Sequence, residues 1–143
     1  MASRLVTDCH PILQPMLRAC IVGWANEHLD VLVTCTWRSG QEQNLLYAQG
    51  RTAPGNIVTN AKAGQSAHNF TIEGRPASLA FDFVPMLNGK PDWNGTGADF
   101  VLWSRAAAVA KRAGLKWYGE PGAPFHELPH CEHPDAVAMR SRL

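Results

Sequence analysis

Apolar residues repeat along the first part of the chain with two different periods, which separates helices from strands. A helical period over about residues 11–26 places on one face Ile12, Leu13, Met16, Leu17, Cys20, Ile21 and Trp24. Residues 31–37 are rich in β-branched side chains and predict a buried strand. Ser39 and Glu42 have the spacing of a capping box, which predicts a helix that ends at Gly50.

The second part of the chain repeats this alternation of elements. Residues 79–84 predict a strand with Leu79, Phe81 and Phe83 on one face and Asp82 on the other. A helix is expected over about residues 98–113, then a strand at 115–118 and a short final helix at about 135–142. This order predicts an α+β fold, in which one small domain has an antiparallel sheet flanked by helices.

Two segments lack any periodicity. Residues 51–78 are rich in Gly, Pro, Asn and Ser, and they predict a long ordered loop of the kind used for binding. Prolines at positions 121, 124, 129 and 134 keep the segment after the third strand extended or turned.

Length and composition narrow the class of protein. A chain of 143 residues that is 45% hydrophobic and 17% charged fits one globular domain. A net charge of +1 predicts no nucleic-acid partner, and no apolar run reaches the roughly 20 residues that cross a bilayer. The start of the chain lacks the pattern of a signal peptide, so we expect a cytoplasmic protein. A monomer is expected, because nothing in the sequence suggests an obligate interface. The four irregularly spaced cysteines are expected to be reduced and buried.

The segment from His126 to His130 matches the HExxH pattern of helical zinc proteases. That mechanism needs a helix, because only the i, i+4 spacing of a helix brings both imidazoles to one metal ion. Pro129 lies between the two histidines and would cost a helix about 3 kcal/mol. We therefore expect an extended segment here.

The same segment can supply a metal site from extended chain. His130 would bind the metal while Glu127 approaches from the side, and His68 and Asp82 would complete three protein ligands. Three such ligands with one open position are typical of catalytic zinc, which activates water for attack on a carbonyl. The residue types therefore suit metal-assisted amide hydrolysis.

These motifs resemble those of a known family. Ser66-Ala67-His68, Ala80-Phe81-Asp82 and Glu127-Leu128-Pro129-His130 together are similar to the D-alanyl-D-alanine carboxypeptidase and L-alanyl-D-glutamate endopeptidase family. That family includes the vancomycin-resistance D,D-dipeptidases and several phage endolysins. The stretches 36–52 and 60–69 resemble its phage members, and the resemblance covers about residues 34–133.

The resemblance assigns roles to individual residues. It implies that Zn²⁺ is bound at the sheet by His68, Asp82 and His130, with Glu127 as the general base. Arg38 matches the arginine that faces the substrate carbonyl in relatives. Two further positions, Ser66 and Gln43, match residues that order the site or hold substrate.

The chain departs from the family pattern in one clear respect. His68 and Asp82 are fourteen positions apart, whereas the commonest family motif separates them by seven. Residues 71–78 are interpreted as an inserted loop, which leaves Glu73 as a rival carboxylate, although a strand fixes Asp82 better. His133 is a rival to His130, and Cys131 stands where relatives often have an aromatic residue.

Several other residues have simpler interpretations. His10 is expected at the surface or at a cap, His126 at the rim of the site, and Cys131 on the face away from the metal. Three tryptophans are expected to pack in the core rather than stack on sugars, namely Trp93, Trp103 and Trp117.

The resemblance implies a zinc metallopeptidase of residues 1–143, without a separate wall-binding domain, that acts as a phage endolysin on the stem peptide of bacterial peptidoglycan. The expected bond is L-alanyl-D-glutamate, and the expected location is the host cytoplasm until a separate membrane-permeabilising protein releases it. A D-alanyl-D-alanine carboxypeptidase or dipeptidase is the alternative within the family. A non-catalytic zinc-bound wall-binding module is the alternative outside it, and the presence of Glu127 argues against that module.

Overall fold

The computed structural model describes residues 2–122 and 126–140. Its elements, in chain order, are η1 (Val6–Asp8), α1 (Gln14–Asn26), β1 (Val31–Cys35), α2 (Gly40–Ala48), η2 (Ala67–Asn69), β2 (Thr71–Ile72), β3 (Arg75–Pro76), β4 (Ala80–Leu87), β5 (Lys90–Pro91), α3 (Ala98–Arg112), β6 (Lys116–Trp117), β7 (His130–Glu132) and α4 (Ala136–Arg140). The mixture of helices and strands confirms the α+β prediction.

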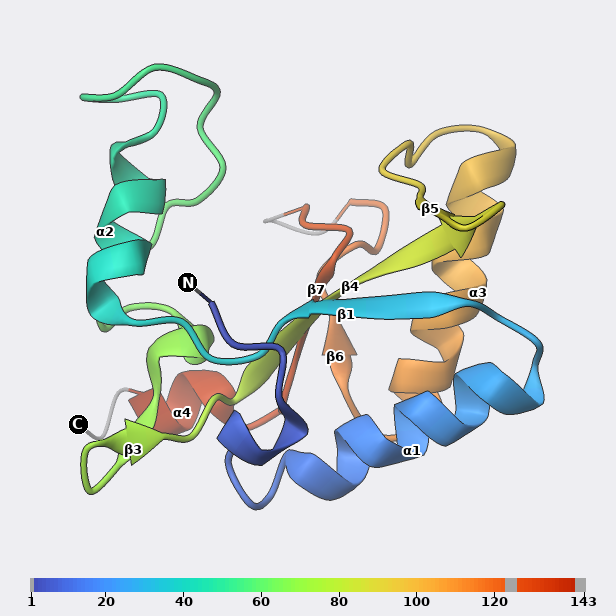
Figure 1. Ribbon diagram of the computed structural model, residues 1–143, viewed down its shortest axis with the longest axis horizontal. Coiled ribbons are helices and arrows are strands. Elements are labelled where there is room, and N and C mark those ends of the chain that lie inside the picture. Colours follow the sequence, from blue (N-terminus) through green and yellow to red (C-terminus); the bar gives the residue numbers. More distant parts are fainter. Residues whose placement is uncertain (1, 123–125, 141–143) are drawn as a thin grey trace.

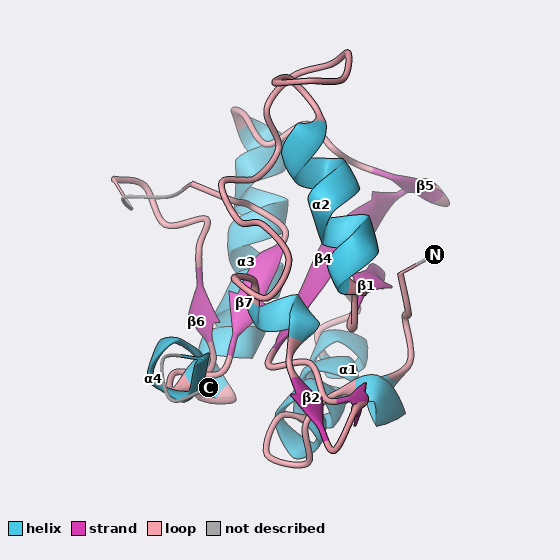
Figure 2. Ribbon diagram, turned by 90° about the vertical axis from the view of Figure 1, so that its left-hand side faces the viewer, coloured by secondary structure: helices cyan, strands magenta, loops and turns pink. Residues whose placement is uncertain are grey.

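The main sheet is antiparallel, as expected, with strand order β1-β4-β7-β6 and with β5 paired to the far end of β4. Figure 2 shows β6, β7, β4 and β1 side by side in that order. The sequence pattern did not predict β7, because it has only three residues between prolines at 129 and 134. This short strand is nevertheless internal to the sheet, where it pairs with β4 on one side and β6 on the other.

One face of the sheet is covered by α1 and α3 and holds the main core. Phe81 and Phe83 of β4 pack against Trp24 of α1, with ring centroids 6.4 and 5.9 Å away. The indole Nε1 of Trp24 donates to the carbonyl of Ala106 in α3 at 3.0 Å, which joins the two helices. Cys131 of β7 is buried in the same cluster, so the prediction that it points away from the metal side is confirmed.

The other side of the sheet is the functional side, and α2 and η2 lie over it (Figures 1 and 2). The predicted capping of α2 is confirmed, because the Ser39 side chain accepts from the Glu42 backbone N–H at 3.1 Å. Gly50, two residues beyond the helix, has φ +81°. A left-handed residue at this place is how many helices end.

The predicted boundaries differ from the structure at a few places. Helix α1 begins at Gln14 rather than near residue 11, with a proline in its first turn. The predicted long loop 51–78 contains η2 and the hairpin β2–β3, whose turn at Glu73 and Gly74 has φ of 52° and 77°. The final helix is described only to Arg140, and positions 141 and 142 of the prediction lie outside the described residues.

The four cysteines are free and buried, as expected. Burial raises the pKa of Cys9 and of Cys20 to about 12, so these two thiols stay protonated and unreactive at neutral pH. Within residues 2–122 and 126–140, none of the helices combines the length and apolar character that a membrane crossing requires.

The close approach of α1 to α3 predicts that Gly23→Ala destabilises the protein. A Cβ at Gly23 would lie 2.5 Å from Cγ1 of Val109, a buried and stiff side chain. Helix propensity alone would favour alanine by up to about 1 kcal/mol, whereas forcing a methyl group into a packed contact costs typically about 1–3 kcal/mol. We expect urea unfolding to show a net loss of about 1 kcal/mol. The same change in a Val109→Ala background should be neutral or stabilising; stabilisation in both backgrounds would contradict the contact.

Candidate functional site

Asp82, near the start of β4, is the centre of the candidate site. It lies opposite Cys35 of β1 on one side and opposite His130 of β7 on the other. Because successive side chains of a strand alternate between faces, its neighbours Phe81 and Phe83 enter the core while Asp82 faces away from it. Strand pairing therefore sets three side chains with metal-binding atoms in a row across the sheet.

His68 reaches this row from η2, which the sequence placed within a loop. Ser66 caps η2, since its hydroxyl accepts from the His68 backbone N–H at 3.2 Å and Asn69 completes a capping box. The buried His68 ring lies with Nδ1 2.7 Å from the Thr36 carbonyl oxygen and Nε2 3.2 Å from Asp82 Oδ1. A carbonyl can only accept, so Nδ1 carries the proton and Nε2 is left facing Asp82.

His130 is oriented in the opposite sense. Its Nδ1 lies 3.3 Å from the same Asp82 oxygen, and its Nε2 lies 2.8 Å from Oε1 of Glu132. The two imidazoles are 5.1 Å apart between centroids and meet edge to face. Each histidine therefore directs one nitrogen at Asp82 and binds a protein oxygen with the other.

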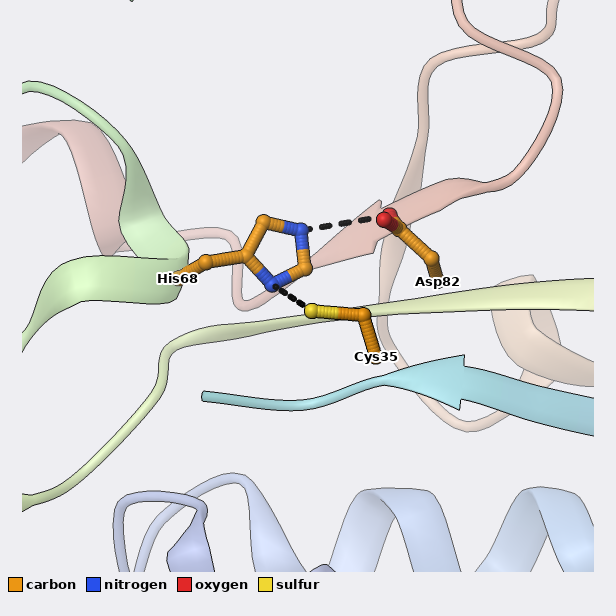
Figure 3. Close-up of side chains that lie close together, drawn as sticks. All are labelled: Cys35, His68 and Asp82. Atoms are coloured by element: carbon orange, nitrogen blue, oxygen red, sulfur yellow. Dashed lines mark hydrogen bonds and ion pairs between the residues drawn. The ribbon is translucent and has the colours of Figure 1, made fainter. Parts of the chain in front are cut away.

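Two sets of donor atoms share His68 and Asp82. Cys35 forms one set with them, because the three ligand atoms lie within 4.8 Å of one another. Figure 3 shows the arrangement: the His68 ring points one nitrogen at Asp82 and the other at Cys35, whose sulfur lies 3.7 Å from Nδ1. His130 forms the other set. The cluster has the donor atoms of a metal site at the sheet.

Arg38 lies beside Asp82 and is held by Gln43. Its Nη2 is 3.5 Å from Asp82 Oδ2, and its Nη1 donates to the Gln43 amide oxygen at 3.0 Å. The fully buried Gln43 also donates to the Ala61 carbonyl at 2.8 Å. Gln43 thus fixes the guanidinium and ties α2 to the loop that follows it.

A pocket of about 1080 Å³ opens over the cluster. Glu127 lies in its wall, with one carboxylate oxygen 3.9 Å from Nδ1 of His130 and with the side chain 42% exposed. Residues 126–129 are not helical, and the Pro129 carbonyl accepts from the Phe83 backbone at 3.0 Å. The prediction that the segment with the HExxH pattern is not helical is confirmed. His126 lines the pocket, as expected.

The charges of the cluster shift its ionisation strongly. Burial works against a charged His68, but the Asp82 carboxylate outweighs it and raises the pKa of His68 to about 10. Burial likewise works against an ionised Asp82, but the two histidines hold the pKa of that carboxyl well below its ordinary value. Without a metal ion, one carboxylate thus balances the neighbouring cations.

The structure brings together most of the residues that the sequence singled out. The pocket is lined by Arg38, Ser66, His68, Asp82, Glu127 and His130. Gln43 contacts Arg38 from behind. The rivals lie elsewhere: Glu73 is exposed at the hairpin turn, and the ring of His133 accepts from the Asp135 backbone and is absent from the described pocket lining.

Sequence reasoning was wrong about Trp93 and missed three residues. Trp103 and Trp117 are buried as expected, but Trp93 is 59% exposed and lines the pocket. The sulfur of Cys35, the carboxylate of Glu132 and the ring of Tyr118 at the site were not foreseen. The position of Glu132, two residues after His130, would have placed both on one face had β7 been recognised.

His10 is half-buried, and its Nδ1 accepts from the Ile12 backbone N–H at 3.1 Å in the turn before α1, whose N-cap is Leu13.

Comparison with known proteins finds a clear relative. The chain is 35% identical over 134 residues to the peptidoglycan L-alanyl-D-glutamate endopeptidase CwlK of Bacillus subtilis (strain 168), which covers 88% of this chain and 74% of CwlK. No protein-family model matches the chain.

Solved structures of peptidoglycan peptidases share the fold. The L-Ala D-Glu endopeptidase ChiX of Serratia marcescens superposes with a TM-score of 0.62 at 17% identity, covering 94% of this chain and 90% of ChiX. The LD-carboxypeptidase LdcB superposes with a TM-score of 0.60, also at 17% identity, covering 94% of this chain and 64% of LdcB.

The ionisation of His68 predicts how the metal-free protein responds to pH. A histidine whose pKa rises on folding, here from 6.5 to about 10, stabilises the fold fully below pH 6.5. That contribution is lost as the pH rises towards 10. With a chelator present, we therefore expect the free energy of unfolding in urea to fall over this range. Asp82→Asn removes the charge that raises the pKa, so its profile should be flatter. Equal slopes in both proteins would contradict the assignment.

Proposed function

Because the chain belongs to the family of the peptidoglycan L-alanyl-D-glutamate endopeptidase CwlK, we propose that it is a zinc-dependent peptidase that hydrolyses the L-alanyl-D-glutamate bond of peptidoglycan stem peptides. Zinc binding in this proposal is supported by one observation, the convergence of His68 Nε2 and His130 Nδ1 on one oxygen of Asp82. Two imidazoles and a carboxylate, with one position open, are a common donor set of catalytic zinc.

Each histidine has one ring nitrogen turned away from Asp82, and the contacts of these two nitrogens favour His130 over Cys35 as the third ligand. His68 Nδ1, the nitrogen nearest the Cys35 sulfur, is occupied by the Thr36 carbonyl. The other nitrogen, Nε2, faces Asp82 at the pocket, where His130 also lies. Metal-binding histidines commonly bind a carbonyl or carboxylate with their other nitrogen, as both histidines do here. In this proposal Cys35 packs behind the site.

Zinc, when bound, supplies a Lewis acid that polarises a carbonyl and lowers the pKa of water towards about 7. Glu127 is the general base in this proposal. Its carboxylate lies at the pocket wall within 3.9 Å of His130 and is open to solvent. From there it can take a proton from the attacking water and pass it to the leaving amine.

Arg38 stabilises the charge that develops on the substrate carbonyl oxygen. It is a pocket-lining cation whose direction is fixed by Gln43 and Asp82, so little reorganisation is needed during the reaction. Ser66 orients His68 through the cap of η2, and Gln43 orients Arg38.

The biological role in this proposal is that of a phage endolysin. The support is the resemblance of residues 36–52 and 60–69 to phage members of the family. As such a lysin, residues 1–143 would form one monomeric catalytic domain that reaches the wall after a separate protein has permeabilised the membrane. A D-alanyl-D-alanine carboxypeptidase would use the same residues and differ in the bond that fits the pocket.

The first test is mass spectrometry of purified peptidoglycan incubated with the protein. We expect release of fragments with a new D-glutamate amino terminus, and loss of that release when a chelator removes the metal. Loss of terminal D-alanine alone would replace the endopeptidase with the carboxypeptidase. Zinc binding without any cleavage would favour a wall-binding module.

The second test is Glu127→Gln, which keeps the shape of the side chain but removes the base. We expect cleavage to fall by about 10²–10⁴-fold, with one zinc ion still bound per chain in a metal assay. Glu73→Gln, on the exposed hairpin turn, is the matched control and should cleave at the parent rate. Full activity of Glu127→Gln would show that another group is the base.

A further inference from the structure

Glu132 is a buried carboxylate behind the candidate metal site. Its residue is 3% exposed, and an ionised carboxylate in such a place is costly unless it is paired. It lies on β7 two positions after His130, so both side chains leave the same face of the strand. Its Oε1 is 2.8 Å from Nε2 of His130, which gives it a cationic or hydrogen-bond-donating partner.

This contact determines which nitrogen of His130 becomes available to a metal ion. Since a carboxylate only accepts hydrogen bonds, both ring nitrogens donate in the metal-free structure, Nδ1 to Asp82 and Nε2 to Glu132. When a metal ion takes the place of the Nδ1 proton, Glu132 keeps the remaining proton on Nε2. Without Glu132, the ring could carry its proton on Nδ1 instead, which would block the metal-facing nitrogen. The carboxylate therefore selects the tautomer that binds metal and fixes the plane of the ring.

Tyr118 lies beside both Glu132 and His130. Its side chain helps to lower the pKa of the Glu132 carboxyl, and its ring lies edge to face on His130, with centroids 4.8 Å apart at 88°. The Tyr118 backbone N–H also donates to the His130 carbonyl at 3.0 Å, just beyond the pairing of β6 with β7. Tyr118 thus contacts the ring, the backbone and the carboxylate partner of one histidine.

The two histidines are supported differently. His68 donates to a neutral backbone carbonyl, that of Thr36, whereas His130 donates to a charged side chain. A carboxylate partner makes an imidazole a stronger ligand than a carbonyl does, because it stabilises positive charge on the ring. Of these two partners, only Glu132, the partner of His130, can be removed by a substitution, because the partner of His68 is a backbone carbonyl.

We propose that Glu132 is a positioning residue that sets the metal affinity of this site through His130, and that Tyr118 holds Glu132 in place for that role. The inference rests on the proposed function, because it requires His130 to be a zinc ligand.

The test measures the zinc dissociation constant of the full chain by competition with a chromophoric chelator. Glu132→Gln retains an acceptor oxygen but loses the charge, and we expect its dissociation constant to rise by about 10–100-fold. Tyr118→Phe removes only the hydroxyl and should give a smaller rise in the same direction. Glu27→Gln, at the end of α1 beside Arg112, is the matched control and should bind zinc as the parent does.

Thermal unfolding of the metal-free variants distinguishes positioning from folding. A positioning role predicts weaker zinc binding by variants that remain folded at the assay temperature. If Glu132→Gln and Tyr118→Phe bind zinc within twofold of the parent, whether or not their melting temperatures fall, the inference is wrong while the proposed function stands. If the parent itself binds no stoichiometric zinc, the proposed metal site fails and this inference fails with it.

Discussion

The pairing of β4 with β7 is the constraint on which the rest of the site depends. Asp82 and His130 are 48 positions apart in the chain, yet the antiparallel register places them directly opposite one another. A shift of one residue in that register would turn His130 into the core and Cys131 towards the pocket. The buried Phe81, Phe83 and Cys131 prevent such a shift, so the apolar core on one face holds the polar cluster on the other.

The polar cluster itself is stable only because its groups satisfy one another. Asp82 faces His68, His130 and Arg38, and the two histidines hold its pKa low despite its burial. The other nitrogen of each histidine is bound to Thr36 or Glu132, and the Arg38 guanidinium is bound to Gln43. Such an arrangement leaves little freedom for the side chains to reorient, which is what a metal site needs in order to bind tightly.

The chain between His68 and Asp82 turns back on itself and returns to the site. It contains the short hairpin β2–β3, which turns at Glu73 and Gly74. The backbone of Leu79 donates to the Ala67 carbonyl at 3.0 Å just beyond the hairpin, so η2 and β4 are rejoined where the hairpin closes. His68 and Asp82 consequently meet although fourteen positions separate them in the chain.

The sequence by itself determined the elements with strong periodicity and the chemical identity of the cluster. The apolar repeats of α1, β4 and α3 are long enough to identify locally, and Pro129 excluded a helical zinc motif on local grounds. Only the tertiary structure decided that a three-residue strand would place His130 beside Asp82, that Thr36, Glu132 and Tyr118 would orient the histidines, and that Trp93 would be exposed at the pocket. The physical reason is separation along the chain. Helix periodicity and proline geometry act within a few residues, whereas strand register and the contacts that orient the two histidines join groups that are distant in the sequence.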